Sequence, residues 1–297
     1  GRTKGRDRRP LPPPMTTRRI SLAAVFLAIC VAAVPSFAAR FAVIAPDKSE
    51  LSTRFADGVT SSLGPDSVDR LAAETAFATL GIETPFNQTA EDARRAGRVI
   101  GADVIVLIHA EVIRRSAFGR DRYFEAAAAV YVVSARTGRL AEWFLASAEM
   151  DTENGAAGAL VERVREVAAR VRESGTAAMR EDVSIGGPDE LPGLVIIDTP
   201  SATGVWAPMP YRRIRPEYTA EASRFRLQAT VDAEVDIDAE GRIARIEFTR
   251  WAGYGLEGSV EKAIRSMNWR PGERNGKPLP VRVLLRYNFT KVERQEP

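Results

Sequence analysis

The feature that most constrains the fold of this chain is a strict alternation of side chains between Leu227 and Ile237. Apolar residues occupy every second position, and polar, mostly acidic residues stand between them. Because successive side chains of a β-strand point to opposite faces, the pattern predicts a strand with one buried and one solvated face. The predicted buried side chains are Val231, Ala233, Val235 and Ile237, and the predicted solvated stripe is Asp232, Glu234, Asp236 and Asp238.

Further elements follow this strand in a recognisable order. A turn at 238–241 leads into a returning strand, Ile243 to Thr249, and then into a helix, Leu256 to Trp269. A final alternating strand runs from Val281 to Phe289. The apolar stripe of the helix is Leu256, Val260, Ala263, Ile264 and Met267. The predicted order is therefore β-β-α-β, within a domain over residues 208–289.

The acidic turn also has the spacing of a calcium-binding loop. Asp236, Asp238, Glu240 and Glu247 fall at ligand positions of that pattern, with Gly241 at its turn. Such a calcium loop lies between two helices, whereas both flanks here have the period of a strand. We therefore favour a hairpin in which the glycine supplies a positive φ.

Several features of residues 208–289 recur in the order and at the spacing of one known family. They are Pro216-Glu217-Tyr218, Asp238-Ala239-Glu240-Gly241-Arg242, Ala263 to Trp269, Pro271, Asn275-Gly276-Lys277-Pro278 and Val281 to Phe289. The region resembles the C-terminal domain of the TonB family. That resemblance implies a module that binds other proteins by offering them the edge of a strand.

The resemblance makes the last strand the expected partner-binding edge. Its candidate residues are Val281, Arg282, Val283, Leu284, Leu285, Arg286 and Tyr287. The odd-numbered apolar residues are predicted to point to the core, and Arg282, Arg286 and Asn288 to point outward. An exposed edge here would offer backbone N–H and C=O groups to an incoming strand. Alternatively, the two arginines do no more than keep this edge soluble.

An α/β domain is predicted before this region, over residues 40–178. Its expected strands are Arg40–Ala45, Asp103–Ile113, Tyr123–Ser134 and Leu140–Glu149, and its expected helices are Ser52–Leu63, Val68–Leu80, 89–100 and Gly158–Arg172. The continuous apolar run after Asp103 predicts a central strand. Thr89 suits a helix N-cap, with Glu91 and Asp92 in the first turn, where the helix dipole favours acids.

Four segments of this domain resemble the N-terminal domain of TolB and the related CsgG-like envelope domains. They are Phe41-Ala42-Val43-Ile44-Ala45, Phe55-Ala56-Asp57-Gly58-Val59, Ile100-Gly101-Ala102-Asp103-Val104-Ile105-Val106 and Thr137-Gly138-Arg139-Leu140-Ala141-Glu142-Trp143. The likeness implies an α/β domain that docks onto other envelope components and is not a catalyst.

The one histidine, His109, lies on the predicted central strand, on the face opposite Val104, Val106 and Ile108. It is either a pH-sensitive contact or a partly buried polar residue on the less buried face. We favour the second interpretation, because a metal ligand or a catalytic base needs a partner that the sequence does not reveal.

The N-terminus has the order of an export signal. Arg18 and Arg19 precede the apolar run Ile20 to Val34, and Ser36-Phe37-Ala38 supplies small residues for cleavage. We interpret residues 15–39 as a signal peptide and residues 1–14 as an upstream extension. The alternative is a membrane anchor, because the uncharged run over 20–39 is twenty residues, just long enough to span a bilayer.

Composition excludes several kinds of site. One histidine and one cysteine, Cys30, leave no disulfide and exclude most zinc sites and any Cys/His or Ser/His machinery. Residues 1–39 hold seven bases against one acid, so the remainder is near neutral and a nucleic-acid surface is unsupported. With no nucleophile–base pair, phosphate loop or metal cluster, we predict no catalytic, cofactor or metal site.

Residues 179–207 are rich in Gly, Pro and acids, and we interpret them as a linker. We interpret residues 290–297 as a tail.

These observations predict a non-enzymatic periplasmic adaptor. It would engage an envelope or outer-membrane transport protein by strand addition and would need no cofactor. One alternative is an envelope-assembly scaffold, in which the C-terminal module forms a homodimer. Another is an inner-membrane-anchored, energy-coupling TonB protein, which would require the N-terminal signal to stay uncleaved.

Overall fold

A computed structural model of the chain describes Gly1 and residues 39–184, 191–197 and 204–290. The described residues between 39 and 290 belong to one compact unit. The predicted upstream extension, signal peptide and tail lie almost entirely outside the described residues. Within those residues, every helix is too short or too polar to span a bilayer.

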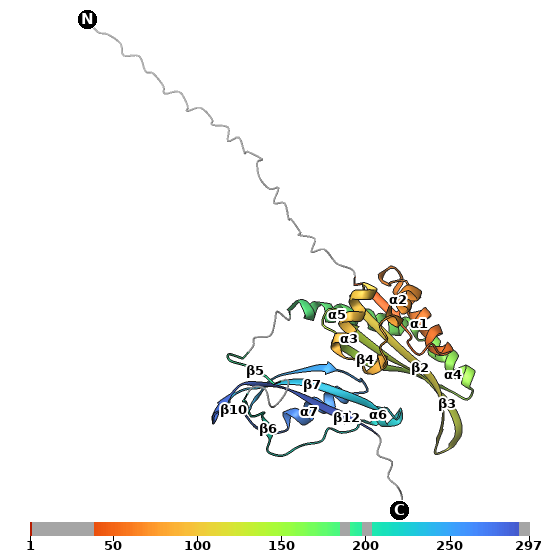
Figure 1. The fold of residues 1–297 in the computed structure, drawn as a ribbon. Helices are drawn as coiled ribbons and strands as arrows, with labels where there is room; N and C mark the ends of the chain where they lie inside the picture. Colours follow the sequence, from red (N-terminus) through yellow and green to blue (C-terminus); the bar gives the residue numbers. More distant parts are fainter. Residues whose placement is uncertain (2–38, 185–190, 198–203, 291–297) are drawn as a thin grey trace, which may run out of the picture. The chain divides into compact units, whose positions relative to one another are not determined.

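The N-terminal lobe, residues 39–184, is built on a sheet with the strand order β1-β2-β3-β4. Its strands are β1 (Phe41–Ile44), β2 (Val104–Ala117), β3 (Arg120–Ser134) and β4 (Leu140–Met150). The β1–β2 pair is parallel, and the β2–β3 and β3–β4 pairs are antiparallel. Strand β2 is interior, as its apolar run predicts, and Figure 1 shows the long β2–β3 hairpin projecting past the helices.

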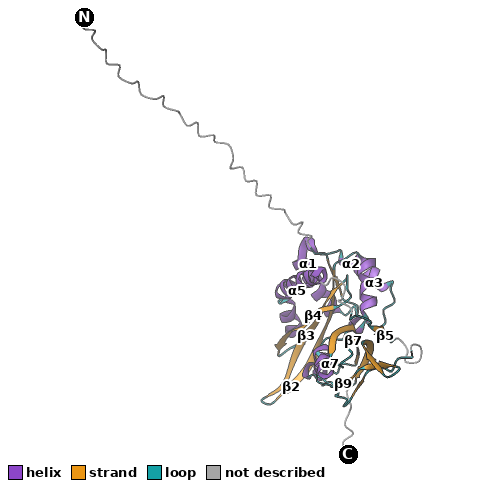
Figure 2. Ribbon diagram, turned by 90° about the vertical axis from the view of Figure 1, so that its left-hand side faces the viewer, coloured by secondary structure: helices purple, strands orange, loops and turns teal. Residues whose placement is uncertain are grey.

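Helices cover both faces of this sheet. The even-numbered side chains of β2 face α1 (Glu50–Leu63), α4 (Glu153–Val161) and α5 (Val164–Ser184). Its odd-numbered side chains share a second cluster with α2 (Arg70–Ala78) and α3 (Ala90–Ile100). Figure 2 shows α1 and α5 on one side of the strands and α3 on the other.

The two ends of α3 follow from the local sequence, as predicted. The Thr89 hydroxyl accepts a hydrogen bond from the backbone N–H of Asp92 (3.1 Å), and Glu91 also lies in the first turn. Gly101 ends the helix with a φ of 72°, in the left-handed region. These contacts satisfy backbone groups that the end of a helix leaves without partners.

The single helix predicted over Gly158–Arg172 is wrong, because two helices divide this stretch. No proline interrupts the sequence here, so helix propensity gives no warning of the break. Tertiary contacts decide it. The Arg163 guanidinium donates to the Ser147 carbonyl on β4 (2.8 Å), and α5 approaches α1 so closely that a Cβ at Gly58 would collide with Val164.

The C-terminal lobe comprises residues 191–197 and 204–290 and contains a sheet with the order β5-β12-β7-β8. Strands β7 (Ala229–Ile237), β8 (Ile243–Arg250) and β12 (Val281–Phe289) pair antiparallel, and the predicted apolar stripe of α7 (Leu256–Arg265) is buried against this sheet. The shorter elements are β5 (Val195–Ile196), β6 (Met209–Pro210), α6 (Ala220–Arg224), β9 (Trp269–Arg270), β10 (Gly272–Arg274) and β11 (Lys277–Leu279). The ββαβ order and the mixture of helices and sheets are confirmed.

The segment predicted as a linker, 179–207, contributes to both lobes within its described residues. Helix α5 continues to Ser184, past the predicted domain boundary at 178. Strand β5 pairs in parallel with Val281 and Arg282 at the start of β12. The apolar island Leu194–Ile197 therefore belongs to the second sheet, where burial and pairing compensate for the short length of the strand.

One hydrophobic cluster joins the two lobes. Trp251, which follows β8, is fully buried, and its indole N–H donates to the Gly138 carbonyl in the β3–β4 turn (3.0 Å). The Tyr131 ring packs against it, with ring centroids 5.8 Å apart. Gly253 has a φ of 72°, and a Cβ there would collide with the ring of Trp143. The loop 251–255 thus fits closely against β3 and β4.

Asn87 forms a second junction between the lobes, because its side chain bonds to backbone groups at the edge of β7 as a neighbouring strand would. It ends the 3-10 turn Pro85–Asn87, and its side-chain amide donates to the Thr230 carbonyl (2.7 Å) and accepts the Thr230 N–H (2.9 Å). The same amide donates to the Trp251 carbonyl (2.8 Å). Backbone groups at the start of β7 and just after β8 are therefore hydrogen-bonded by the other lobe, so burying them costs little free energy.

Replacing Trp251 with alanine should destabilise both lobes together. The change removes a fully buried indole and leaves the Gly138 carbonyl without its donor, so we expect a loss of about 3–5 kcal/mol in the free energy of unfolding. Urea denaturation followed by circular dichroism measures it. Trp206→Ala is the matched control, because that side chain is 79% exposed and should cost less than about 0.5 kcal/mol. Equal losses in the two variants would contradict the junction.

Candidate functional site

The second edge of β12 is free along most of its length among the described residues. Strand β7 pairs with the whole of one edge, whereas β5 pairs with the other edge at Val281 and Arg282. In that parallel pairing, the Val195 N–H donates to the Pro280 carbonyl (3.0 Å), and the Ile197 N–H donates to the Arg282 carbonyl (3.1 Å). The first two residues of the predicted partner-binding edge, Val281 and Arg282, are therefore already paired within the protein's own sheet.

These bonds determine which backbone groups of β12 face outward. The N–H and C=O of one strand residue point to the same side, and the side alternates along the strand. Because the carbonyls of Pro280 and Arg282 face β5, the backbone groups of Leu284, Arg286 and Asn288 face the free edge. The odd-numbered residues face β7. The edge left open to another strand runs over residues 283–289.

The side chains of β12 lie as the alternation predicts. Val281, Val283 and Phe289 are buried on the α7 side of the sheet, and Leu285 and Tyr287 are partly buried with them. Leu284, Arg286 and Asn288 are the exposed residues. The first strand of the motif and the last one thus present the same apolar face to α7.

A groove of about 670 Å³ lies beside the free edge. Residues 284–287 line it with side chains from both faces of β12, so it lies at the edge of the strand and not on a face. The opposite wall is the segment 208–216, which is held by the β6–β9 pairing and by a bond from the Tyr211 N–H to the Asn268 carbonyl (2.9 Å). The groove has the position that an added strand would need.

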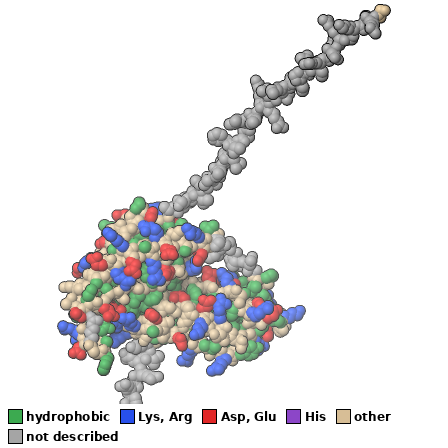
Figure 3. All heavy atoms as spheres, turned by 180° about the vertical axis from the view of Figure 1, so that it is seen from behind, with side chains coloured by type: hydrophobic (Ala, Val, Ile, Leu, Met, Phe, Trp, Pro, Cys, Tyr) green, Lys and Arg blue, Asp and Glu red, His purple; other side chains and the backbone are tan. Residues whose placement is uncertain are grey.

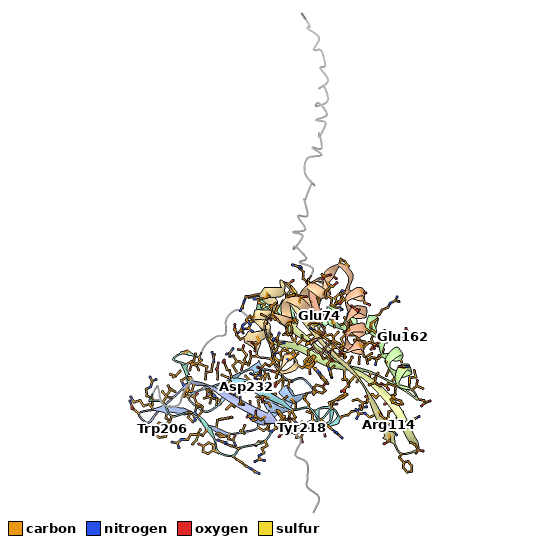
Figure 4. All side chains as sticks on the ribbon, turned by 45° about the vertical axis from the view of Figure 1, so that its right-hand side comes forward. Glu74, Arg114, Glu162, Trp206, Tyr218 and Asp232 are labelled. Carbon is orange, nitrogen blue, oxygen red and sulfur yellow. The ribbon has the colours of Figure 1, made fainter. Side chains whose placement is uncertain are left out.

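The lining of this groove is apolar and basic. Its exposed apolar residues are Met209, Ile214 and Leu284, and its arginines are Arg213, Arg215 and Arg286. Acidic residues are absent from the described lining. Trp206, labelled in Figure 4 at the outer end of the second sheet, is 79% exposed and lines an adjoining hollow with Met209. By contrast, acidic and basic side chains are interspersed over the face shown in Figure 3.

A buried carboxylate joins the three main strands on the opposite face of the sheet. Asp236 of β7 has a side chain that is 4% exposed. It accepts two hydrogen bonds from the Arg282 guanidinium of β12 (2.6 and 2.9 Å) and one from Arg245 of β8 (3.1 Å). Burial by itself raises the pKa of Asp236, but the two arginines outweigh it, so the pKa is lowered.

Asp232, labelled in Figure 4, is held in the same way. The Arg286 guanidinium donates two bonds to it (2.7 and 2.8 Å), and Arg250 donates one (3.3 Å). The prediction of a solvated acidic stripe is therefore wrong for Asp232 and Asp236. Alternation within one strand cannot show that arginines of both neighbouring strands lie beside it. The outward arginines of β12 act as ion-pair partners in addition to covering an edge.

The acidic turn is a hairpin, as predicted. Strands β7 and β8 flank it, and Gly241 has a φ of 81°. The Asp238 carboxylate accepts the backbone N–H groups of Glu240 (3.0 Å) and Arg242 (2.8 Å), which is how it stabilises the turn. Across the described ranges, no group of three or more His, Cys, Asp or Glu residues is arranged to hold a metal ion.

His109 has a partner that its sequence neighbours do not reveal. Its Nδ1 lies 2.6 Å from Oδ2 of Asp47, in the loop between β1 and α1, and the Asp47 carboxylate also accepts the Ser52 hydroxyl (2.9 Å). The hydrogen bond with Asp47 raises the pKa of His109. Burial opposes the charge on Asp47, but its bonds to His109 and Ser52 prevail and lower its pKa. The histidine is partly buried, as predicted, within an ion pair.

The second wall of the groove beside β12 could not be identified from the sequence. The available signal was a segment rich in proline and arginine with exposed apolar residues, since Pro208, Pro210 and Pro216 keep it extended. Its partner across the groove is more than sixty residues further along the chain. Proximity at that separation comes from the fold, and no local pattern indicates it.

A comparison with protein families identifies part of the C-terminal lobe. Residues 214–290 match the family described as Gram-negative bacterial TonB protein C-terminal. They are a TonB C-terminal domain, as the sequence predicts. The match does not extend to the N-terminal lobe, so the resemblance to TolB and CsgG-like domains stays a prediction. A search of curated proteins found no match to the chain.

Three solved structures have a distant likeness to the chain. The solution structure of the TonB C-terminal domain of Pseudomonas aeruginosa is 18% identical, with 34% of this chain and 97% of that chain covered and a TM-score of 0.27. A hypothetical protein of Chlamydia trachomatis is 16% identical, with 47% and 99% covered and a TM-score of 0.34. A lipoprotein of Neisseria meningitidis is 17% identical, with 44% and 99% covered and a TM-score of 0.28.

Replacing Asp236 with asparagine should destabilise the protein by roughly 3 kcal/mol at neutral pH, because two arginines lose their buried counter-charge. A carboxyl whose folded pKa is lowered contributes stability above its unfolded pKa of 3.8 and loses that contribution as pH falls through the folded pKa. The deficit of the variant should therefore shrink in acid, as urea denaturation across pH measures. Glu240→Gln, at an exposed ion pair, should cost less than about 0.5 kcal/mol.

Replacing His109 with glutamine should change stability in one pH window. A raised histidine pKa contributes stability below the unfolded value of 6.5, and that contribution is lost as pH rises through the folded pKa. At the acid end the contribution ends when the Asp47 carboxylate is protonated, and its lowered pKa places that point below pH 3.8. Wild type should exceed the variant in urea midpoint at pH ~5.5 and approach it at pH ~9. Because His109 is the one histidine, its NMR titration reports the pKa directly, and a value below 6.5 would contradict the ion pair.

Proposed function

We propose that the C-terminal lobe binds an extended segment of another cell-envelope protein by adding it as a strand to β12. The observation that carries this proposal is the open edge over residues 283–289 beside a groove that can receive a chain. Strand addition needs a row of unpaired backbone groups and pockets for alternate side chains. The backbone groups of Leu284, Arg286 and Asn288 would supply the first, and the groove would supply the second.

The proposed contacts divide the candidate residues of the last strand into three roles. Leu284 and Arg286 would bond the incoming backbone, and the exposed Leu284 side chain would contact its apolar residues. Val283, Leu285 and Tyr287 would hold β12 against β7 and α7. Val281 and Arg282, which already pair with β5, would mark where the incoming strand has to stop.

The lining of the groove indicates the chemistry of the partner segment. Arg213 and Arg215 make no ion pair with a described residue, and both line the groove beside Leu284. A segment that alternates apolar and acidic side chains would meet charge of the opposite sign along the edge. Such complementarity contributes to specificity and to the rate of association more than to the affinity itself.

The chain would act as a non-enzymatic adaptor in the periplasm. A TonB C-terminal domain in this lobe supports that location and a role in protein binding. The N-terminal lobe would carry the module and orient it through the Trp251 junction. A scaffold role would use the same edge to pair two copies of the chain, and coupling to an inner-membrane motor would require the N-terminal signal to remain as an anchor.

Proline at Leu284 should weaken binding of a short peptide of alternating valine and glutamate. Proline removes the N–H that faces the free edge, and an edge strand tolerates it because that N–H makes no bond within the sheet. We expect the dissociation constant, measured by isothermal titration calorimetry, to rise at least about tenfold, a loss of about 1.4 kcal/mol. Leu284→Ala is the control, because it keeps the N–H and should weaken binding less.

Proline at Val283 is unsuitable for this test, since the N–H of Val283 faces β7 and its loss would break the sheet itself. Unchanged affinity in Leu284→Pro would overturn strand addition at this edge. Failure of the peptide to bind, together with a dimer in sedimentation that Leu284→Pro converts to monomer, would instead favour the scaffold role.

A further inference from the structure

A second groove lies between the two lobes' sheets, on the other side of β7 from β12. Its volume is about 790 Å³. Residues 139–143 at the start of β4 line one wall, and residues 245–248 of β8 line the other. Both sets are consecutive and therefore include side chains from both faces of their strands. The groove thus lies where the outer edges of two different sheets face each other, since β4 and β8 are the last strands in their sheets.

The pairing of β7 determines which backbone groups of β8 face this groove. The odd-numbered residues of β7 face β12, so Glu234 and Asp236 face β8, where they pair with Glu247 and Arg245. Ile246 and Phe248 alternate with Arg245 and Glu247 along β8. Their backbone N–H and C=O groups therefore face away from β7. They point along the sheet into the groove and make no strand pair among the described residues.

Aromatic side chains line the groove where it passes the lobe junction. The rings of Trp143 and Tyr254 lie against each other, with centroids 4.4 Å apart, and Phe248 and Trp251 also line it. The indole N–H of Trp143 is buried, and its neighbours include Gly253 and the Tyr131 hydroxyl.

The charges that line the groove are not balanced. Its two arginines are already paired, since Arg139 bonds to Glu181 (2.7 Å) and Arg245 bonds to Asp236 (3.1 Å). Glu221 and Glu257 make no ion pair with a described residue. The uncompensated charge of the groove is therefore acidic, and it lies beside aromatic rings, a combination that favours a cation.

Glu257 is the acid best placed for such a contact. Its Oε1 accepts the backbone N–H groups of Ala252 (2.6 Å) and Gly253 (2.9 Å), which fixes the carboxylate at the mouth of the Trp251 loop. The carboxylate accepts no hydrogen bond from the side chain of a described residue. Burial raises the pKa of Glu257 against the effect of these backbone bonds, and no neighbouring cation opposes that rise.

We propose that this groove binds an extended peptide segment that adds as a strand to the open edge of β8 and places a lysine or arginine side chain beside Glu257, against Trp143 and Tyr254. Unpaired strand edges on the walls favour a peptide backbone as the occupant, and the uncompensated acids favour a basic side chain. The groove uses neither β12 nor the segment 208–216, so this inference stands independently of the proposed function.

Titration calorimetry with a short peptide of alternating valine and threonine that carries one central lysine tests the proposal. The full chain should bind this peptide, and the matched peptide with glutamine in place of lysine should bind at least about tenfold more weakly. Glu257→Gln should remove that preference, because glutamine keeps the Oε1 acceptor for the two backbone N–H groups but has no charge. A circular dichroism spectrum and a urea midpoint equal to those of the wild type would verify that Glu257→Gln folds.

Two further variants locate the site. Ile246→Pro removes an N–H that faces the groove and should abolish binding of the lysine peptide, whereas Ile246→Ala keeps that N–H and should retain most of it. Leu284→Pro, which acts on β12, should leave the affinity unchanged. Loss of binding in Leu284→Pro, equal binding of the two peptides, or a dimer that occupies the β8 edge in sedimentation would overturn the proposal.

Discussion

Trp251 carries the contact on which both lobes of the molecule depend. The C-terminal lobe inserts this side chain and the loop after it against β3 and β4, and the indole N–H satisfies the carbonyl of the β3–β4 turn. One hydrophobic cluster therefore includes residues of both sheets. A lobe of this size buries a limited share of its own apolar surface, so each gains stability from the other. The positive φ of Gly253 and the lack of a Cβ there make the close approach possible.

Paired charges give the second sheet its rigidity at the position where function would require it. Asp232 and Asp236 on β7 each lie between an arginine of β8 and an arginine of β12. These buried pairs fix three strands in register without using the backbone groups of the outer edges. Among the described residues, both outer edges stay unpaired over part of their length, one beside the segment 208–216 and the other beside β4. A rigid sheet with open edges is suited to add strands from partners.

Much of the fold follows from local patterns. The alternation before Ile237, the glycine in the hairpin, the apolar stripe of α7 and the capping residues of α3 all predict elements that the structure contains. The prediction is wrong where a choice depends on distant residues. Helix propensity could not reveal the break before Val164, which packing against α1 and β4 decides. Alternation alone could not reveal that Asp232 is buried, because its arginine partners lie on two other strands.

The sequence by itself determined the long strands of both sheets, the helix α7 and the family of residues 214–290, because period, turn chemistry and motif spacing act over short stretches of chain. Only the tertiary structure decided which part of that edge is free, what lines the grooves beside it and which charges lack partners. Those properties depend on contacts between residues far apart in the chain, such as His109 with Asp47 and Trp251 with Gly138, and their energy exists only once the chain has folded.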